Sequence, residues 1–150
     1  MSNELIESKF PALGLSIFTE MSGLAIATNA INLSQGFPEF ETPPFLKNAV
    51  NEAINSNKNQ YSPSPGSPEL LAEIGKLIER HYQLAVTPSS MITVTSGATE
   101  ALFVAIQALV RPGDEVIIFD PAYDSYQPAV ELAGGKCIHI PLQAPTYQVD

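Results

Sequence analysis

Four small residues, Ser96-Gly97-Ala98-Thr99, form a run that is suited to binding an anion. The pattern predicts a strand before them and a helix after them, so they would lie at the helix start. Free amides and the positive end of the helix dipole favour an anion there. Gly97 and Ala98 would let the anion approach closely, and Thr99 would add a hydroxyl donor. The alternative is structural: Ser96 or Thr99 caps the helix, and Gly97 makes the turn.

Two tyrosines are placed where an aromatic ring can meet a ligand. Tyr123, in FDPAYDSY (119–126), follows a predicted strand, and its ring would lie at the edge of the sheet. Tyr61 stands in QYSPSPG (60–66), on a loop stiffened by prolines. The alternatives are a Tyr123 packed between helix and strand, and a Tyr61 that is only a partly exposed loop residue.

Other reactive side chains carry weaker signals. His81 and His139 lack the neighbours of a metal site, and we expect His139 to pack or pair at a strand end. Cys137 is expected to be a buried, inert thiol. Asp120, at a strand end, has the position to orient a neighbour. Glu100 would complement the helix dipole but oppose a phosphate. The sequence thus predicts no metal site.

Alternating strands and helices must position these residues. The second half of the chain predicts, in order, a strand at Met91–Thr95, a helix through Glu100–Val110, a strand at Glu115–Asp120, a helix about Ser125–Ala133 and a strand at Lys136–Pro141. This order implies parallel crossovers and an α/β fold. The apolar run EVIIFD is typical of a strand covered by helices on both faces.

The first half is predicted to be mostly helical. We expect a short helix through Ile17–Ala27, a strand at Ile31–Leu33 and a helix opened by Thr42-Pro43-Pro44. After an irregular stretch over residues 56–68, Ser67-Pro68-Glu69 opens another helix that should end near Tyr82.

Composition excludes several classes of protein. The 150 residues are 45% hydrophobic and carry 7 basic against 16 acidic side chains, for a net charge of −9. This balance argues against a disordered chain and against a nucleic-acid-binding surface. No apolar run is long enough to cross a membrane, and the N-terminus does not look like a signal peptide. With one cysteine, Cys137, we expect a cytoplasmic protein.

Four segments in register resemble one family. INLSQGFPEF (31–40), QYSPSPGSPEL (60–70), VTSGATEAL (94–102) and PGDEVIIFDPAYDSY (112–126) resemble the N-terminal part of class I pyridoxal-phosphate aminotransferases. The similarity covers nearly all of residues 10–141 and is strongest to the methionine/aromatic and kynurenine–glutamine group. It implies fold type I, with residues 1–40 as an N-terminal arm and substrate-side segment and residues 41–150 as the start of the cofactor-binding large α/β domain.

The resemblance also implies roles for individual residues. Gly97, Ala98 and Thr99 would bind the phosphate of pyridoxal 5'-phosphate, and Tyr123 would stack on its pyridine ring. Tyr61 would reach the phosphate bound by the neighbouring subunit, which implies a homodimer with shared sites. Two further residues would contact the substrate. The backbone of Gly36 would contact the substrate carboxylate, and Phe18 would line the pocket for the substrate side chain.

None of the lysines at positions 9, 47, 58, 76 and 136 stands in the context of the family's Schiff-base lysine, which in relatives comes well after residue 150. We therefore expect no catalytic residue in this chain, a longer parent protein, and no activity from the 150 residues alone.

For the parent, the resemblance implies transfer of an amino group from a hydrophobic, sulfur-containing or aromatic L-amino acid to a 2-oxo acid. A cysteine-conjugate β-lyase of the same family and a non-catalytic ligand-sensing domain of this fold are the alternatives.

Overall fold

The structure is a computed structural model that describes residues 7–149, except residues 12, 37 and 39. The chain divides into two compact units, one ending at Asn55 and one beginning at Ser56, and each is described by itself. Residues 1–6 of the predicted arm, and Phe37 and Glu39 of its turn segment, lie outside the described residues.

The first unit contains two helices, α1 (Ile17–Thr28) and α2 (Pro44–Asn55). Helix α1 begins where the Ser16 hydroxyl accepts a hydrogen bond from the Thr19 amide at 3.3 Å. Both predicted helices are confirmed. The predicted strand at Ile31–Leu33 is wrong, because this segment pairs with no other part of the described chain and both of its apolar ends are exposed.

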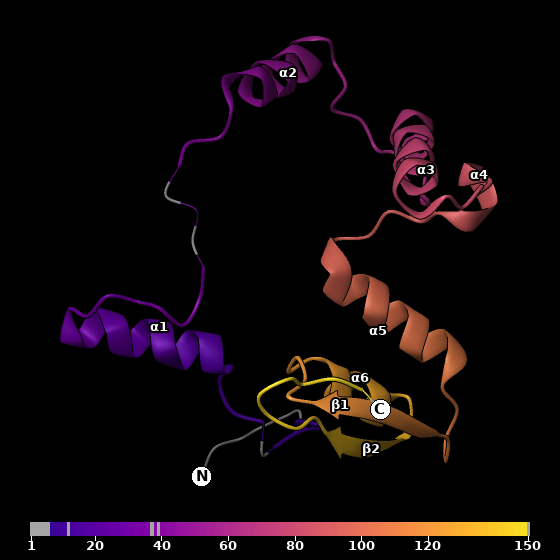
Figure 1. The fold of residues 1–150 in the computed structure, drawn as a ribbon. Helices are drawn as coiled ribbons and strands as arrows, with labels where there is room; N and C mark the ends of the chain where they lie inside the picture. Colours follow the sequence, from indigo (N-terminus) through magenta and orange to yellow (C-terminus); the bar gives the residue numbers. More distant parts are fainter. Residues whose placement is uncertain (1–6, 12, 37, 39, 150) are drawn as a thin grey trace. The chain divides into compact units, whose positions relative to one another are not determined.

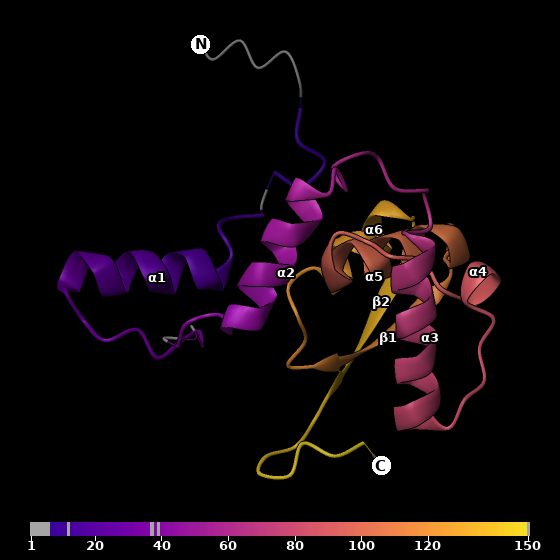
Figure 2. The ribbon, with the colours of Figure 1, turned by 90° about the horizontal axis from the view of Figure 1, so that it is seen from above.

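The second unit contains the remaining elements, shown in Figures 1 and 2. Its helices are α3 (Pro68–Tyr82), α4 (Pro88–Met91), α5 (Gly97–Leu109) and α6 (Tyr126–Leu132). Helix α3 opens as predicted: the Ser67 hydroxyl accepts from the Leu70 amide at 3.3 Å, and Pro68 occupies the first turn. It ends at Tyr82, also as predicted, because Gln83 adopts a left-handed backbone with φ 53°.

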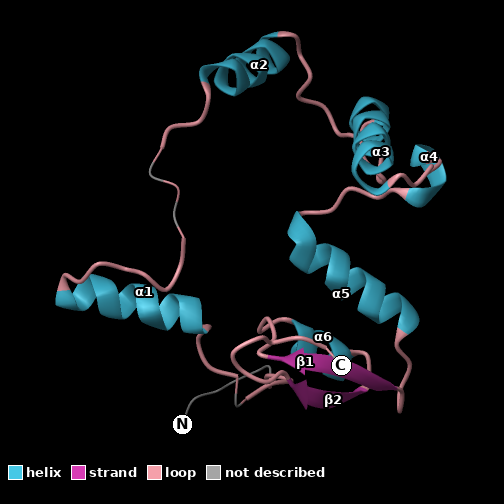
Figure 3. Cartoon of the chain, in the orientation of Figure 1, coloured by secondary structure: helices cyan, strands magenta, loops and turns pink. Residues whose placement is uncertain are grey.

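Two parallel strands, β1 (Glu115–Asp120) and β2 (Lys136–Pro141), form the sheet drawn in Figure 3. Glu115 pairs with Lys136 and Asp120 with Pro141, and α6 makes the crossover between the strands. Both strands and their parallel direction were predicted, so the α/β fold is confirmed.

The strand expected over Met91–Thr95 is not formed. Met91 is the last residue of α4, and the residues after it are extended but unpaired with any described strand. Within this segment the Val94 amide donates to the Pro65 carbonyl at 2.8 Å, which belongs to a loop and not to a strand. A β-branched, extended segment becomes a strand only when a neighbouring strand accepts and donates along it.

Most of the buried hydrophobic residues lie between the sheet and α6, and Leu71 of α3 is buried apart from them. Ile118 of β1 and Val130 of α6 are buried, with exposed fractions of 6% and 1%. The expectation that helices cover both faces of β1 is wrong within the described residues, since Ile117 is 60% exposed. In the part of the chain that the structure describes, no helix has the length and apolar character needed to span a bilayer.

Candidate functional site

In Figure 1, α5 and β1 run in roughly opposite horizontal directions, so that the start of α5 and the end of β1 both lie on the left of these two elements. Only the turn at 110–114 separates the end of α5 at Leu109 from the start of β1 at Glu115, so the chain reverses direction between them. A 13-residue helix and a 6-residue strand are each about 20 Å long. Over these lengths the reversed chain brings the helix start back toward the carboxyl end of the strand, where parallel sheets bind ligands.

The predicted anion-binding turn is the first turn of α5. The helix begins at Gly97, three residues earlier than the helix expected from Glu100. Gly97 has φ +82°, a left-handed conformation that suits glycine, and a Cβ there would meet no atom within 4 Å. Its amide donates to the Thr95 carbonyl at 2.9 Å, and the Thr95 hydroxyl donates to the Gly97 carbonyl at 3.0 Å. These bonds hold the turn while leaving the space beside Gly97 open.

The amides of Ala98 and Thr99 are the donors available to an anion. Over the residues that the structure describes, no acceptor is recorded for either amide, and both residues are exposed. Two unsatisfied amides at a helix start, aligned with the helix dipole, are the donors that an anion would require, so this turn is the candidate anion site.

Capping at this helix start comes from a carboxylate. The Ser96 hydroxyl makes no capping bond, so the alternative role for that side chain is wrong. The Ser96 amide instead donates to Oε2 of Glu100. Glu100 thus occupies one amide and places a negative charge beside the turn, as expected from its position.

Tyr123 lies in the loop that follows β1. Its side chain is 45% exposed, so it is not packed away between helix and strand. Its ring meets that of Tyr126 edge to face, with centroids 5.9 Å apart and planes at 63°. The Tyr126 amide donates to the Tyr123 carbonyl at 3.2 Å, which ties this loop to the start of α6. The ring therefore lies at the carboxyl end of β1 and is accessible.

The other predicted residues are less closely defined. Tyr61 is fully exposed on its proline-rich loop in the second unit. Gly36 and Phe18 belong to the first unit: Gly36 is exposed with open space around it, and Phe18 is half-buried on α1. The roles assigned to these three residues stay predictions.

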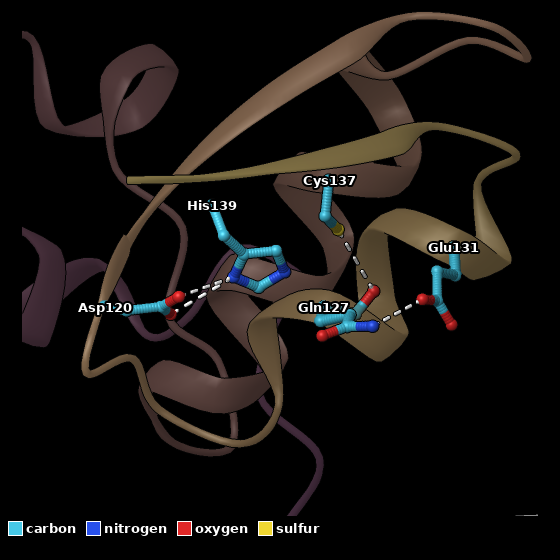
Figure 4. A network of polar contacts seen from close by, with 5 residues as sticks. All are labelled: Asp120, Gln127, Glu131, Cys137 and His139. Carbon is cyan, nitrogen blue, oxygen red and sulfur yellow. Dashed lines mark hydrogen bonds and ion pairs between the residues drawn. The ribbon is translucent and has the colours of Figure 1, made fainter. Parts of the chain in front are cut away.

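A polar network on β1, β2 and α6 was only partly foreseen (Figure 4). Nδ1 of His139 lies 2.9 Å from Oδ2 and 3.1 Å from Oδ1 of Asp120. The expectation that His139 pairs at a strand end is confirmed, but its partner was not identified, because it lies 19 residues away in sequence. Among the described residues, no group of His, Cys, Asp and Glu side chains has the arrangement of a metal site.

Cys137 is half-buried, not fully buried as expected. Its thiol lies 3.9 Å from the Gln127 carbonyl, and the Gln127 amide group donates to Glu131 at 2.7 Å. Burial, and secondarily the negative charge of Glu131, raise the pKa of the Cys137 thiol above its usual value.

We expect Cys137 to react slowly with iodoacetamide near pH 8, because the raised pKa leaves little of the nucleophilic thiolate. Glu131→Gln should increase the alkylation rate severalfold at most, since burial is the larger cause. Mass spectrometry of timed samples measures the rate, with Glu79→Gln on α3 as the matched control. An unchanged rate in Glu131→Gln would rule out the electrostatic contribution.

Comparison with known proteins identifies relatives over nearly the whole chain. A family model described as aminotransferase class I and II matches residues 28–150. The methionine aminotransferase of Escherichia coli strain K12 is 51% identical over 150 residues, which are 99% of this chain and 39% of that protein. A probable N-succinyldiaminopimelate aminotransferase of Mycobacterium tuberculosis is 42% identical over 135 residues, covering 90% of this chain and 34% of that protein.

A solved structure gives the same result. The crystal structure of YbdL from Escherichia coli, described as identifying a methionine aminotransferase function, superposes with a TM-score of 0.90 at 50% identity. The match covers 97% of this chain and 38% of that one. The chain thus spans well under half the length of the relatives that it matches.

Proposed function

The chain belongs to the aminotransferase class I and II family, and from this membership we propose that the whole protein is a pyridoxal-phosphate-dependent aminotransferase. It moves the amino group of a hydrophobic, sulfur-containing or aromatic L-amino acid, with methionine as the first candidate, to a 2-oxo acid. The similarity to methionine aminotransferases supports this choice of substrate. The fold-type-I architecture expected from the four motifs is confirmed.

The start of α5 fits the phosphate of pyridoxal 5'-phosphate. The amides of Ala98 and Thr99 would donate to the phosphate oxygens, and the Thr99 hydroxyl would add a third donor. Gly97 lets the group approach, since the space that a Cβ would occupy is open. The single observation that carries the proposal is this glycine-led helix start, at which the amides of Ala98 and Thr99 are available.

Tyr123 would stack on the pyridine ring, and its half-exposed position after β1 supports that role. When bound, the cofactor supplies an electron sink for the carbanion formed at the substrate α-carbon. The residues of this chain contribute binding and orientation: the α5 amides hold the phosphate end, and the tyrosine ring limits rotation of the pyridine.

Three further assignments extend the proposal. Tyr61 would bind the phosphate in a neighbouring subunit, so that the protein would be a homodimer with shared sites. Gly36 would contact the substrate carboxylate and Phe18 the substrate side chain. Residues 1–40 would form the arm and substrate-side segment, and residues 41–150 the start of the large domain. We propose a cytoplasmic location, which a single free cysteine supports.

The whole protein tests this proposal directly. Purified protein should bind pyridoxal 5'-phosphate far more tightly than pyridoxal, because only the former carries the anion that α5 binds. With methionine and a 2-oxo acid, it should yield the 2-oxo acid that retains the methionine side chain. Equal affinity for both cofactor forms would contradict the phosphate assignment. Formation of pyruvate and ammonia from a cysteine conjugate, without transamination, would identify a β-lyase. Binding of the amino acid without any turnover would identify a ligand-sensing protein.

A further inference from the structure

The carboxylate at the end of β1 is held by a side chain from β2. Asp120 is the last residue of β1, and both of its carboxylate oxygens contact Nδ1 of His139, at 2.9 and 3.1 Å (Figure 4). His139 lies opposite Ile118 in the parallel register, and Asp120 lies opposite Pro141. Side chains at paired and alternate positions point to one face of a sheet, so the contact follows from the register.

A backbone hydrogen bond also holds Asp120. The Leu142 amide, just after β2, donates to the Asp120 carbonyl at 2.9 Å. Within the described residues, the Asp120 carboxylate makes its hydrogen bonds to His139 through both of its oxygens. On α6, the Gln127 side chain donates to Glu131 and the Gln127 carbonyl faces the Cys137 thiol. The end of β1 is therefore fixed from β2.

This contact is poorly suited to stabilising the fold as a whole. The side chains of His139 and Asp120 are 39% and 40% exposed, and ion pairs so accessible to water stabilise proteins only weakly. Its effect is local, at the residue where the strand becomes the loop. That loop carries the Tyr123 ring three residues later.

We propose that His139 is a positioning residue for Tyr123: by holding Asp120 it fixes the direction in which the chain leaves β1, and so the plane of the ring that stacks on the cofactor. The inference rests on the proposed function. His139 itself is not a catalytic residue, since it acts through Asp120 and the loop.

The test compares two substitutions in the whole protein. His139→Leu removes the donor, whereas His139→Asn keeps an N–H group at the place of Nδ1. We expect His139→Leu to weaken pyridoxal 5'-phosphate binding about three- to tenfold, measured by equilibrium dialysis, and to alter the circular dichroism of the bound cofactor. The melting temperature of the apoprotein should change by no more than about 2 °C. His139→Asn should restore the affinity to within about twofold of the unsubstituted protein.

Three outcomes would contradict either this proposal or the proposed function. Unchanged affinity and dichroism in His139→Leu would overturn the proposal. So would a large drop in melting temperature in both variants, because that result describes a residue needed for folding. Asp120→Asn, which retains an acceptor for His139, should behave like His139→Asn if the contact itself matters. Failure of the unsubstituted protein to bind pyridoxal 5'-phosphate would instead show that the proposed function is wrong.

Discussion

Replacing Ala98 with aspartate is expected to lower the affinity of the whole protein for pyridoxal 5'-phosphate by about 100-fold or more while leaving α5 intact. The new carboxylate would lie in the first turn of α5, beside amides that have no recorded acceptor in the described chain. Two unit charges about 5 Å apart repel by about 3 kcal/mol at an effective dielectric constant of about 20. That energy is about 100-fold in affinity.

The same substitution should slightly stabilise the helix, because an acidic residue in the first turn complements the dipole by about 0.3–1 kcal/mol. Affinity and stability should therefore move in opposite directions, which a general loss of structure cannot produce. Equilibrium dialysis gives the affinity and thermal unfolding of the apoprotein gives the stability. Ala98→Asn is the matched control, because asparagine has the shape of aspartate without its charge. Its affinity for pyridoxal 5'-phosphate should fall by less than about tenfold. Equal losses in both variants would exclude the electrostatic explanation.

Gly66→Ala is expected to reduce the free energy of unfolding by about 2–4 kcal/mol. Gly66 is buried and has φ +121°, a conformation that side chains other than glycine's rarely adopt. A Cβ there would lie 2.7 Å from Cγ2 and 3.0 Å from Cβ of Val94. Relief would require moving the segment that leads into the proposed anion-binding turn, so cofactor affinity should fall as well.

Gly113→Ala provides the matched control for that prediction. Gly113 also has a positive φ, +92°, but a Cβ at this position would meet no atom within 4 Å. Gly113→Ala should therefore reduce the free energy of unfolding by about 1 kcal/mol, from backbone strain alone. Denaturant unfolding of both variants of the whole protein gives the difference, which measures the steric conflict with Val94. A loss in Gly66→Ala no larger than that in Gly113→Ala would show that the surroundings of Gly66 adjust freely.

Much of the candidate site follows from local sequence. The small residues at 96–99 predict a helix start. The apolar run EVIIFD followed by proline predicts the end of a strand and a loop after it. Parallel pairing of β1 with β2 then makes the end of β1 an edge at which such sheets bind ligands. The sequence predicts only the charge of Glu100 on the helix dipole, and the structure adds its bond to the Ser96 amide. A capping box places its acid three residues after the cap, whereas Glu100 lies four residues after Ser96, so that pattern does not predict this bond.

Local interactions let the sequence alone determine where α3 begins and ends, where β1 and β2 lie, and that the two strands run parallel. A capping residue, a proline or a left-handed residue determines the backbone over only three or four neighbouring positions. Apolar periodicity predicts a helix or a strand without knowledge of the element that packs against it. Only the tertiary structure decided that the segments at 31–33 and 92–95 are not strands, since a strand requires a partner. Only it joined Asp120 to His139, because strand register brings together residues far apart in sequence.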